Sequence, residues 1–414
     1  MTEYNAQTMR SLAARVAATS AVLQSFGVER VATAIAEATA LLLDDRTDPG
    51  RALRDELEVG TGLSGRMIEW GLSSTLGSAD YAALLRAAAP IKERDRQIPA
   101  PARLAVVILA GNVFAAALRA VVFPLLAGIP VVAKASEDDD ALARYLKQAL
   151  DRTDPLVGAC YEVVTFGGSR AELLDALFEE AEVVELYGSD QTVAAVRGRL
   201  PPQVRLVEHG HGLGALYLPA EAVSSQARAL EVIGRAALDV AAYDQRGCLS
   251  PHIILLQKGG APDGSSFARM LAEQGLAPLQ KTLARGHLPI EAAAAQLQWR
   301  GVAAARGRLF EGDAFAVSYE AGAELRPSPG FRNVGVYDCE GLASLAERLQ
   351  AFGAHLKALG VAGDLEERRV VARALRPPLA PRICAVGAMQ TPALDALADG
   401  QDPFIGLVRW IEVD

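Results

Sequence analysis

The feature that most constrains the fold is a series of short apolar runs, separated by helix-length segments, between residues 104 and 208. The runs occupy residues 104–110, 129–133, 161–166, 182–188 and 204–208. The first two are nearly continuous apolar runs, which are typical of parallel strands that helices cover on both faces. The alternation therefore predicts an α/β fold with a doubly wound parallel sheet, whose ligand site lies beyond the carboxyl ends of the strands.

The apolar stretch from residue 104 to 136 is long enough to span a membrane, but Asn112, Arg119 and Pro124 interrupt it. Polar side chains at the centre of a bilayer are costly. We therefore expect no membrane span, and predict a strand, a helix over 112–127 and a second strand. The N-terminal segment also lacks the basic start and unbroken apolar core of a signal peptide, so we expect a cytoplasmic protein.

Four regions follow from the periodicity. Residues 1–95 show only helical periodicity and predict a helical N-terminal region, and residues 96–218 hold the strand and helix alternation. Residues 219–385 predict a second α/β domain. We expect the C-terminal segment, 386–414, to pack on the first α/β domain or on a partner subunit.

Charge and cysteine spacing argue against a nucleic-acid-binding protein, a disulfide-stabilised protein and a zinc protein. The net charge is −9 and no run of Lys or Arg is present, so we expect no nucleic-acid partner. The four cysteines are widely spaced, form no C-x-x-C pair and share no zinc-ligand spacing with the five histidines. We therefore expect neither a disulfide framework nor a metal site.

Cys248 stands in a polar turn between a helical segment and an apolar strand, next to Gly247, Ser250 and Pro251. A cysteine without a chemical role is usually buried and behaves as a small hydrophobe. Its place in a turn favours a reactive thiol, although a solvent-shielded loop cysteine remains an alternative.

The chain lacks the G-x-G-x-x-G dinucleotide fingerprint. A different phosphate-site candidate is "LYGSDQTV", where Gly188 ends a predicted strand and Ser189 begins a helix. A helix N-terminus favours an anion. The alternative is that Ser189 merely caps the helix.

Taken in order, five segments resemble the motifs of the aldehyde dehydrogenase superfamily. They are "ILAGNVFAAALRA", "VVAKASE", "ELYGSDQTV", "LVEHGHGLG" and the Cys248 turn. The segments "YDQRGCLSPH" and "RICAVGAMQTPALDALADGQDPFIGLVRW" are similar to the acyl-CoA reductase family of the LuxC type, typified by the fatty-acid reductase of bacterial luminescence. The resemblance covers roughly residues 100–414. It implies an aldehyde-dehydrogenase-like fold, with residues 96–218 as a Rossmann-like NAD(P)-binding domain and residues 219–385 as the catalytic domain.

The resemblance implies three catalytic residues. Cys248 is the nucleophile that forms a thioester, and Asn112 donates to the oxyanion together with the backbone N–H of Cys248. As an alternative, Asn112 caps the following helix. Glu208 matches the glutamate that activates water in hydrolytic enzymes, and in a reductase it would manage the protons, with His209 and His211 beside it. The alternative for Glu208 is that it only accepts hydrogen bonds from backbone donors at the end of its strand.

The resemblance also implies a cofactor site at Lys134, Ser136 and Glu137, together with the Gly188–Ser189 turn. Lys134 would bind a ribose hydroxyl or a phosphate, unless it is a solvated loop lysine. Glu137 would repel the 2′-phosphate of NADPH. The luminescence reductases use NADPH, so we place NADPH first and NADH second. The E-x-F-G-P segment of the superfamily aligns near 327–332, where no carboxylate matches, so the nicotinamide contacts stay unassigned.

The function that these motifs predict is an acyl-thioester reductase that forms an aldehyde with NAD(P)H. The alternatives are an NAD(P)-dependent aldehyde dehydrogenase that produces a carboxylic acid, and a non-catalytic partner subunit on the same fold. The expected partners are an acyl-CoA or acyl-carrier thioester, further copies of the chain in a homo-oligomer, and an acyl-donating protein.

Overall fold

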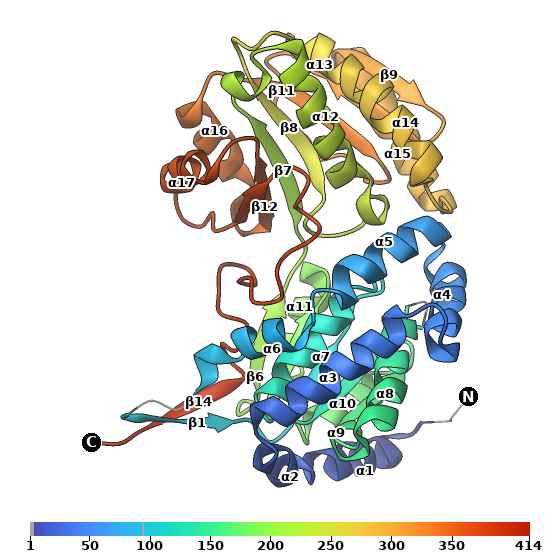
Figure 1. The fold of residues 1–414 in the computed structure, drawn as a ribbon, viewed down its shortest axis with the longest axis vertical. Helices are drawn as coiled ribbons and strands as arrows, with labels where there is room; N and C mark the ends of the chain where they lie inside the picture. The colour runs from blue at the N-terminus through green and yellow to red at the C-terminus, as the bar shows by residue number, and fades with distance from the viewer. Residues whose placement is uncertain (1–3, 93–94, 138) are drawn as a thin grey trace. The chain divides into compact units, whose positions relative to one another are not determined.

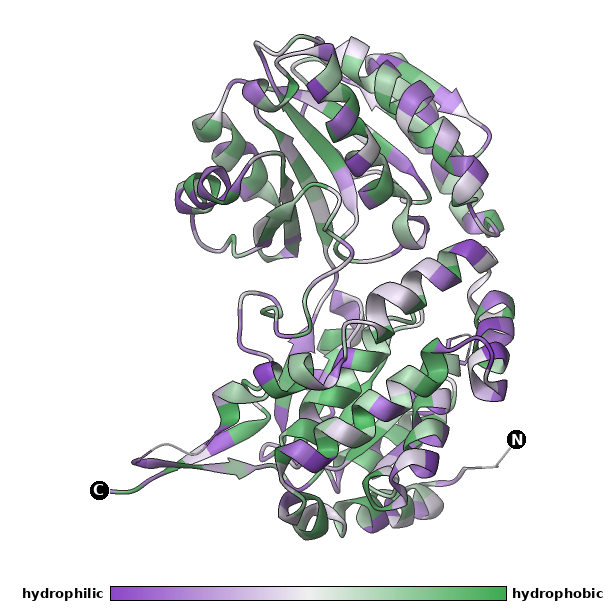
Figure 2. Cartoon of the chain, viewed as in Figure 1, coloured by the Kyte–Doolittle hydropathy of each residue, from purple (hydrophilic) through white to green (hydrophobic). Residues whose placement is uncertain are grey.

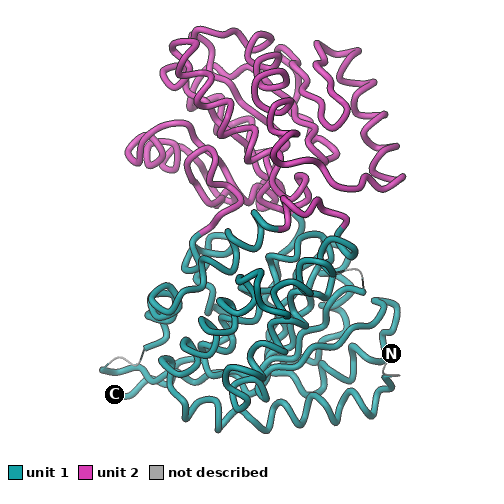
Figure 3. Tube along the Cα trace, turned by 45° about the vertical axis from the view of Figure 1, so that its right-hand side comes forward, with its two compact units in different colours: residues 1–61, 69–211, 393–414 teal, residues 62–68, 212–392 magenta. Residues whose placement is uncertain are grey.

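The structure, a computed structural model, describes residues 4–92, 95–137 and 139–414 (Figure 1). The chain forms two compact units, shown in teal and magenta in Figure 3. Unit 1 comprises residues 1–61, 69–211 and 393–414, and unit 2 comprises residues 62–68 and 212–392.

The N-terminal region is helical, as predicted. Its helices are α1 (Ala6–Ala17), α2 (Ser20–Ser25), α3 (Gly27–Leu43), α4 (Asp48–Thr61), α5 (Gly65–Leu76), α6 (Tyr81–Ala87) and the short 3-10 helix η1 (Ala89–Ile91). The side chain of Asn5 caps α1 by accepting a hydrogen bond from the Thr8 backbone N–H at 2.9 Å. Such a cap satisfies one of the amides that a helix leaves without a partner at its start.

Unit 1 contains the predicted parallel sheet. Its strands are β2 (Ala105–Ile108), β3 (Val131–Ala135), β4 (Tyr161–Thr165), β5 (Val183–Tyr187) and β6 (Arg205–His209), in the spatial order β4-β3-β2-β5-β6. All neighbouring pairs are parallel. The connections run outward in one direction from β2 and in the other from β5, which makes the carboxyl ends of β2 and β5 the topological switch point.

Helices cover both faces of this sheet, as the apolar strands require (Figure 2). They are α7 (Ala116–Leu126), α8 (Ala141–Thr153), α9 (Pro155–Gly158), α10 (Ala171–Phe178) and α11 (Asp190–Arg197). Helices α1 and α10 share one core with Val106 and Val184, and α7 and α8 pack with α3. Helix α7 begins four residues after the predicted start at Asn112.

Unit 2 holds a second doubly wound sheet in the order β13-β12-β7-β8-β11-β10-β9, in which only β9 is antiparallel to its neighbour. The strands are β7 (Leu213–Leu218), β8 (Pro251–Gln257), β9 (Arg308–Gly312), β10 (Phe315–Tyr319), β11 (Asn333–Cys339), β12 (Leu356–Val361) and β13 (Arg382–Ala385).

The helical elements of unit 2 are η2 (Ala220–Val223), α12 (Gln226–Ala241), η3 (Ala242–Gln245), α13 (Gly264–Met270), the π-helix η4 (Leu271–Leu276), α14 (Ala277–Thr282), α15 (Ile290–Arg306), α16 (Leu342–Leu349), η5 (Gln350–His355) and α17 (Leu365–Ala374). Helices α12 and α13 and the π-helix cover one face of the sheet, and α16 and α17 cover the other. Both cores of unit 2 are therefore closed by helices of this unit.

The compact units depart from the predicted region boundaries at residues 62–68, 212–218 and 386–392, all of which belong to unit 2. Strand β7 pairs with β8 and β12, so residues 212–218 belong to unit 2 and not to the region 96–218. Residues 393–414 return to unit 1, where β14 (Val408–Glu412) pairs antiparallel with β1 (Gln97–Pro101). An apolar run does not by itself say which sheet it joins, because pairing partners lie far away in the sequence.

Within the described part of the chain, no helix combines the length and the apolar character needed to cross a bilayer.

Candidate active site

Cys248 lies in a turn at the amino end of β8, closed by a hydrogen bond of 3.0 Å from Ser250 N–H to the Gly247 carbonyl. Its side chain is exposed, whereas Cys160, Cys339 and Cys384 are buried. Burial raises the pKa of the Cys384 thiol to about 11. The shielded-cysteine alternative is therefore wrong, and Cys248 is the accessible thiol of the described chain.

The position of Cys248 also corrects one expectation. In doubly wound α/β sheets, ligand sites lie at the carboxyl ends of the strands. The Cys248 turn instead precedes its strand, β8. Ser250 links the end of this turn to Gln390. Its buried hydroxyl accepts a hydrogen bond of 3.0 Å from Gln390 Nε2.

The residues directly before the turn have an unusual backbone. Tyr243, Asp244 and Gln245 have φ angles of 50°, 52° and 60°, in the left-handed region. This conformation costs roughly 1–2 kcal/mol for each residue that carries a Cβ. The sequence offers no glycine here that would indicate such a backbone, and strain of this kind is concentrated at functional sites.

Asn112 lies in unit 1, exposed in the turn that follows β2 at the switch point. Helix α7 has Ala115 at its N-cap position, so the alternative in which Asn112 caps this helix is wrong. A Cβ on Gly111 would lie 2.5 Å from Ser136 Oγ. Glycine therefore allows the Asn112 turn to approach the Ser136 loop closely.

Lys134 belongs to β3 and is only 8% exposed. Its Nζ lies 5.4 Å from the centre of the Phe166 ring. Burial lowers the pKa of Lys134, and the nearby Glu137 carboxylate acts against that shift. The alternative of a solvated loop lysine is therefore wrong.

Glu137 lies against the glycine pair that follows β4, since a Cβ on Gly167 would be 3.3 Å from its Oε2. A cavity of about 350 Å³ opens beside it. Five acidic residues line this cavity: Asp55, Glu56, Glu137, Asp139 and Asp140. Arg144 pairs with Glu56 and Asp140. The acidic residues around Glu137 thus come from α4 and from the segment that follows β3.

The Gly188–Ser189 turn follows β5, next to the Asn112 turn in the strand order. Ser189 Oγ accepts a hydrogen bond of 3.2 Å from the Thr192 backbone N–H, so it caps α11. A Cβ on Gly188 would lie 3.2 Å from Thr192 Cβ, which keeps this turn compact. The turn is therefore compact, and Ser189 caps α11, which is the alternative that the sequence left open for this residue.

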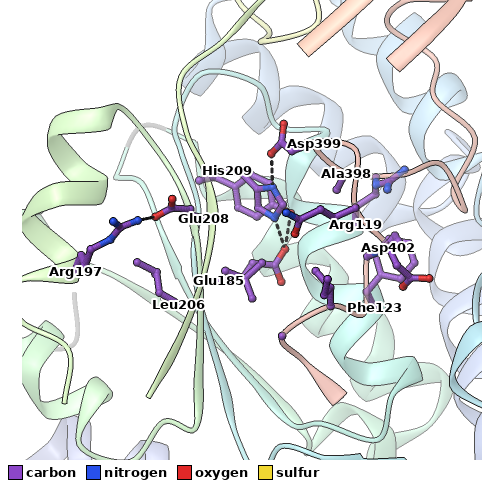
Figure 4. A pocket seen from close by; sticks show the side chains of 16 residues that line it. Arg119, Phe123, Glu185, Arg197, Leu206, Glu208, His209, Ala398, Asp399 and Asp402 are labelled. Atoms are coloured by element: carbon purple, nitrogen blue, oxygen red, sulfur yellow. Dashed lines mark hydrogen bonds and ion pairs between the residues drawn. The ribbon is translucent and has the colours of Figure 1, made fainter. Parts of the chain in front are cut away.

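Glu208 lies on β6, the edge strand, with 42% of its side chain exposed, and forms an ion pair with Arg197 of α11. The side-chain partner of Glu208 is therefore the Arg197 guanidinium, and not the backbone donors of the alternative. In Figure 4, Glu208 and Arg197 lie on the side of β6 away from His209. The structure does not place Glu208 in the Lys134 and Glu137 cluster.

A polar cluster that the sequence did not indicate lies at the carboxyl ends of β5 and β6, beside a cavity of about 520 Å³ (Figure 4). His209 lies between two carboxylates, with Nδ1 2.9 Å from Asp399 Oδ2 and Nε2 3.3 Å from Glu185 Oε1. The Tyr187 hydroxyl donates to Glu185 at 2.6 Å, and its ring stacks on the imidazole with 4.4 Å between the ring centres.

Burial opposes the charge on His209, but hydrogen bonds to Asp399 and Glu185 outweigh it and raise the pKa of His209 to about 9. His209 therefore carries a proton at neutral pH, and this leaves it unsuited to act as a base there. Through these two contacts His209 links β5 and the returning segment around Asp399.

The raised pKa predicts a pH-dependent contribution to stability. Because the folded-state pKa lies above the unfolded value of about 6.5, the stabilisation is complete below pH 6.5 and is lost as the pH rises through about 9. His209→Gln should lower the free energy of unfolding by up to roughly 3 kcal/mol at pH 6 and by much less at pH 10. Urea denaturation of His209→Gln and of wild type at pH 6, 8 and 10 measures the difference. A difference for His209→Gln that stays constant with pH would contradict the assignment.

A family model described as acyl-CoA reductase (LuxC) matches residues 66–410. No curated protein matches the chain in sequence.

Solved structures share the fold at low sequence identity. A putative aldehyde dehydrogenase, PutA, from Anabaena variabilis is 18% identical with a TM-score of 0.74, over 99% of this chain and 94% of that one. An NAD-dependent benzaldehyde dehydrogenase from Corynebacterium glutamicum is 13% identical with a TM-score of 0.77, over 100% and 91%. The glyceraldehyde-3-phosphate dehydrogenase GapN from Methanocaldococcus jannaschii, solved with NADP, is 11% identical with a TM-score of 0.73, over 100% and 95%.

The predicted fold class, aldehyde-dehydrogenase-like α/β, is therefore confirmed. With the family match extending over most of the sequence, the chain belongs to the acyl-CoA reductase (LuxC) family and is an NAD(P)-dependent oxidoreductase.

Proposed function

We propose that this chain reduces an acyl thioester, either acyl-CoA or an acyl-carrier thioester, to an aldehyde through a covalent intermediate on Cys248. The observation that carries the proposal is the exposure of Cys248 in its turn, when the other three cysteines are buried. A thiolate attacks an acyl carbonyl readily, and the thioester it forms is a good acceptor of hydride.

The proposed reaction consists of two additions to the acyl carbonyl, the first by the Cys248 thiolate and the second by hydride. The Cys248 thiolate attacks the carbonyl carbon, the bond to the donor sulfur breaks, and the donor leaves as a thiol after taking a proton. NAD(P)H, when bound, supplies a hydride to the carbonyl carbon of the Cys248 thioester. The resulting thiohemiacetal collapses to the aldehyde and restores the Cys248 thiolate. We assign to Asn112 the donation of a hydrogen bond to the oxyanion that forms in each addition.

The residues around the switch point of unit 1 fit a dinucleotide. The Gly188 turn and the capped start of α11 suit a phosphate group. A Cβ on Gly168 would meet no heavy atom within 4 Å, so the backbone there is open to a close approach. Lys134, Ser136 and Glu137 would hold the ribose at the adjacent strand ends.

The acidic surroundings of Glu137 bear on the choice of cofactor. The resemblance to the luminescence reductases orders NADPH before NADH, but the cavity beside Glu137 is lined by four further acidic residues. Two like charges a few ångströms apart at a protein surface repel each other by on the order of 1 kcal/mol or more. These carboxylates would therefore disfavour the 2′-phosphate of NADPH. This charge distribution supports NADH as the better cofactor of the two.

Glu137→Gln should therefore raise the ratio of kcat/KM for NADPH to that for NADH by about tenfold. The ratio is measured by initial rates with each reduced cofactor and one acyl-CoA. Glu58→Gln is the control, since it removes an exposed acid of α4 that does not line the cavity, and the ratio should stay near the wild-type value. An unchanged ratio in Glu137→Gln would show that this carboxylate does not face the ribose.

Two measurements test the direction of the reaction: the ratio of aldehyde released to cofactor consumed, and the activity of Glu208→Gln. The wild-type protein, given an acyl-CoA with NADPH or NADH, should release aldehyde and consume cofactor in equal amounts, with acid only as a slow side product. Glu208→Gln should still form the acyl-enzyme and reduce it, because hydride transfer needs no activated water. Intact-protein mass spectrometry and product analysis measure both.

The alternative functions give other results in the same experiment. An aldehyde dehydrogenase would form acid rapidly from aldehyde with NAD(P)+, reduce no thioester, and lose acid release in Glu208→Gln. A non-catalytic partner subunit would show neither reaction.

We also propose that the chain forms a homo-oligomer. The two-stranded β1–β14 ribbon carries Ile98 and Ile411 as cross-strand partners, with 39% and 55% of their surfaces exposed. Exposed apolar side chains on a short ribbon with open edges favour pairing with another surface. An acyl-donating protein is a second partner that this surface would suit.

A further inference from the structure

Two segments of unit 2 carry five of the six described non-glycine residues with positive φ. The first is residues 243–245, directly before the Cys248 turn, and the second is Phe331 and Arg332, with φ of 52° and 66°. Backbone strain of this kind persists only where the surrounding structure holds it, so contacts around the two segments must account for it.

A buried ion pair joins the two segments. Arg332 is 0% exposed and Asp244 is 1% exposed. Arg332 Nε and Nη2 donate to Asp244 Oδ1 at 2.9 and 2.7 Å, and Nη1 donates to the Leu283 carbonyl at 2.7 Å. The second carboxylate oxygen of Asp244 accepts from Gly286 N–H at 2.9 Å. Each charged group is therefore satisfied from more than one direction, as a buried charge requires.

Gln245 adds a second link between the segments. It is 2% exposed, and its Nε2 donates to the carbonyls of Pro251 at 2.7 Å and Asn333 at 2.8 Å. Residues 245 and 251 lie on the two sides of Cys248 in the sequence. This side chain therefore spans the turn that carries the thiol, and it connects that turn to the residue after Arg332.

Stability alone is a poor reason for this arrangement. The desolvation cost of a buried ion pair largely cancels its attraction, and a strained backbone persists only where its surroundings hold it in place. We propose that Asp244 and Arg332 are positioning residues, which hold the backbone of residues 243–245 so that Cys248 points its thiol correctly at the acyl carbonyl. The inference rests on the proposed role of Cys248 as nucleophile.

The test compares wild type with the double variant Asp244→Leu/Arg332→Met, which removes both charges and leaves neither buried alone. Two quantities are measured: hydrogen exchange of the amides in 243–250, and the rate of acylation of Cys248 by an acyl-CoA. We expect exchange in this segment to be faster, and acylation slower, by about tenfold or more each. Alkylation of Cys248 by iodoacetamide needs only an exposed thiol, and its rate should stay within about threefold of wild type.

Controls separate positioning from general loss of structure. Glu320→Gln changes another fully buried carboxylate of unit 2, paired with Arg306, and should leave exchange in 243–250 and acylation at wild-type rates. If the double variant does not fold, Arg332→Lys replaces it, because lysine keeps the buried charge opposite Asp244 but loses the forked contact that also reaches the Leu283 carbonyl. The same faster exchange and slower acylation are expected.

Two results would overturn the inference: exchange in 243–250 at the wild-type rate, or faster exchange with unchanged acylation. If the wild-type protein accepts an acyl group from no thioester, the proposed function fails. In that case the exchange comparison still decides whether the ion pair holds the turn, so the two failures are distinguishable.

Discussion

Replacement of Cys248 by alanine is expected to abolish both the acyl-enzyme and the formation of aldehyde, with a loss in kcat of at least about 10⁴-fold. No other exposed thiol is present in the described chain to take over the attack. Because the Cys248 side chain is exposed, the substitution should change the free energy of unfolding by no more than about 0.5 kcal/mol. Mass spectrometry of the intact protein after mixing with acyl-CoAs, together with cofactor consumption, measures the effect.

The matched controls are Cys160→Ala, Cys339→Ala and Cys384→Ala. These thiols are buried, so their removal should lower stability by about 1 kcal/mol each while acylation continues. Acyl labelling that persists in Cys248→Ala and disappears in one of these three variants would assign the nucleophile to that cysteine.

The cores of the two units could be predicted because their signal is local. Strands β2 and β3 lie in nearly continuous apolar runs, and the alternation of such short runs with helices leaves few topologies to consider. The assignment of β7 to unit 2 was not accessible in this way. Its partners β8 and β12 lie about 40 and 140 residues further along the chain, and periodicity contains no information about pairing at that distance.

The β1–β14 ribbon was missed for a related reason. Pro99 and Pro101 occupy one strand, and proline is typical of edge strands rather than of sheet interiors. The partner strand stands at the other end of the chain, so neither segment shows the alternation of a half-buried strand.

The candidate site divides in the same way. Cys248 and Ser189 could be singled out because their types are informative in a turn and at a helix start. The Asp244–Arg332 pair and the His209 cluster could not be found, because their members are 88 and up to 214 residues apart in sequence. The one hint in the sequence is that Asp244 and Arg332 are charged residues in short segments with apolar neighbours, and this does not identify them as partners of each other.

Asn112→Ala should lower kcat by about 10²-fold or more, with little change in the KM for NAD(P)H. The amide is proposed to stabilise the oxyanion, which exists only during addition to the carbonyl and not in the bound substrate, so its loss should act on kcat rather than on binding. Asn112 is exposed, and Ala115 rather than Asn112 is the N-cap residue of α7. We therefore expect the free energy of unfolding to stay within about 0.5 kcal/mol of wild type.

Asn5→Ala is the matched control, because it makes the same chemical change in unit 1 at an asparagine that does cap a helix. Its loss should lower the free energy of unfolding by about 1 kcal/mol and leave kcat unchanged. The two variants should thus show opposite patterns in steady-state kinetics and urea denaturation. If Asn112→Ala instead loses stability and keeps its kcat, the residue supports the turn after β2, and the oxyanion must be stabilised by backbone donors alone.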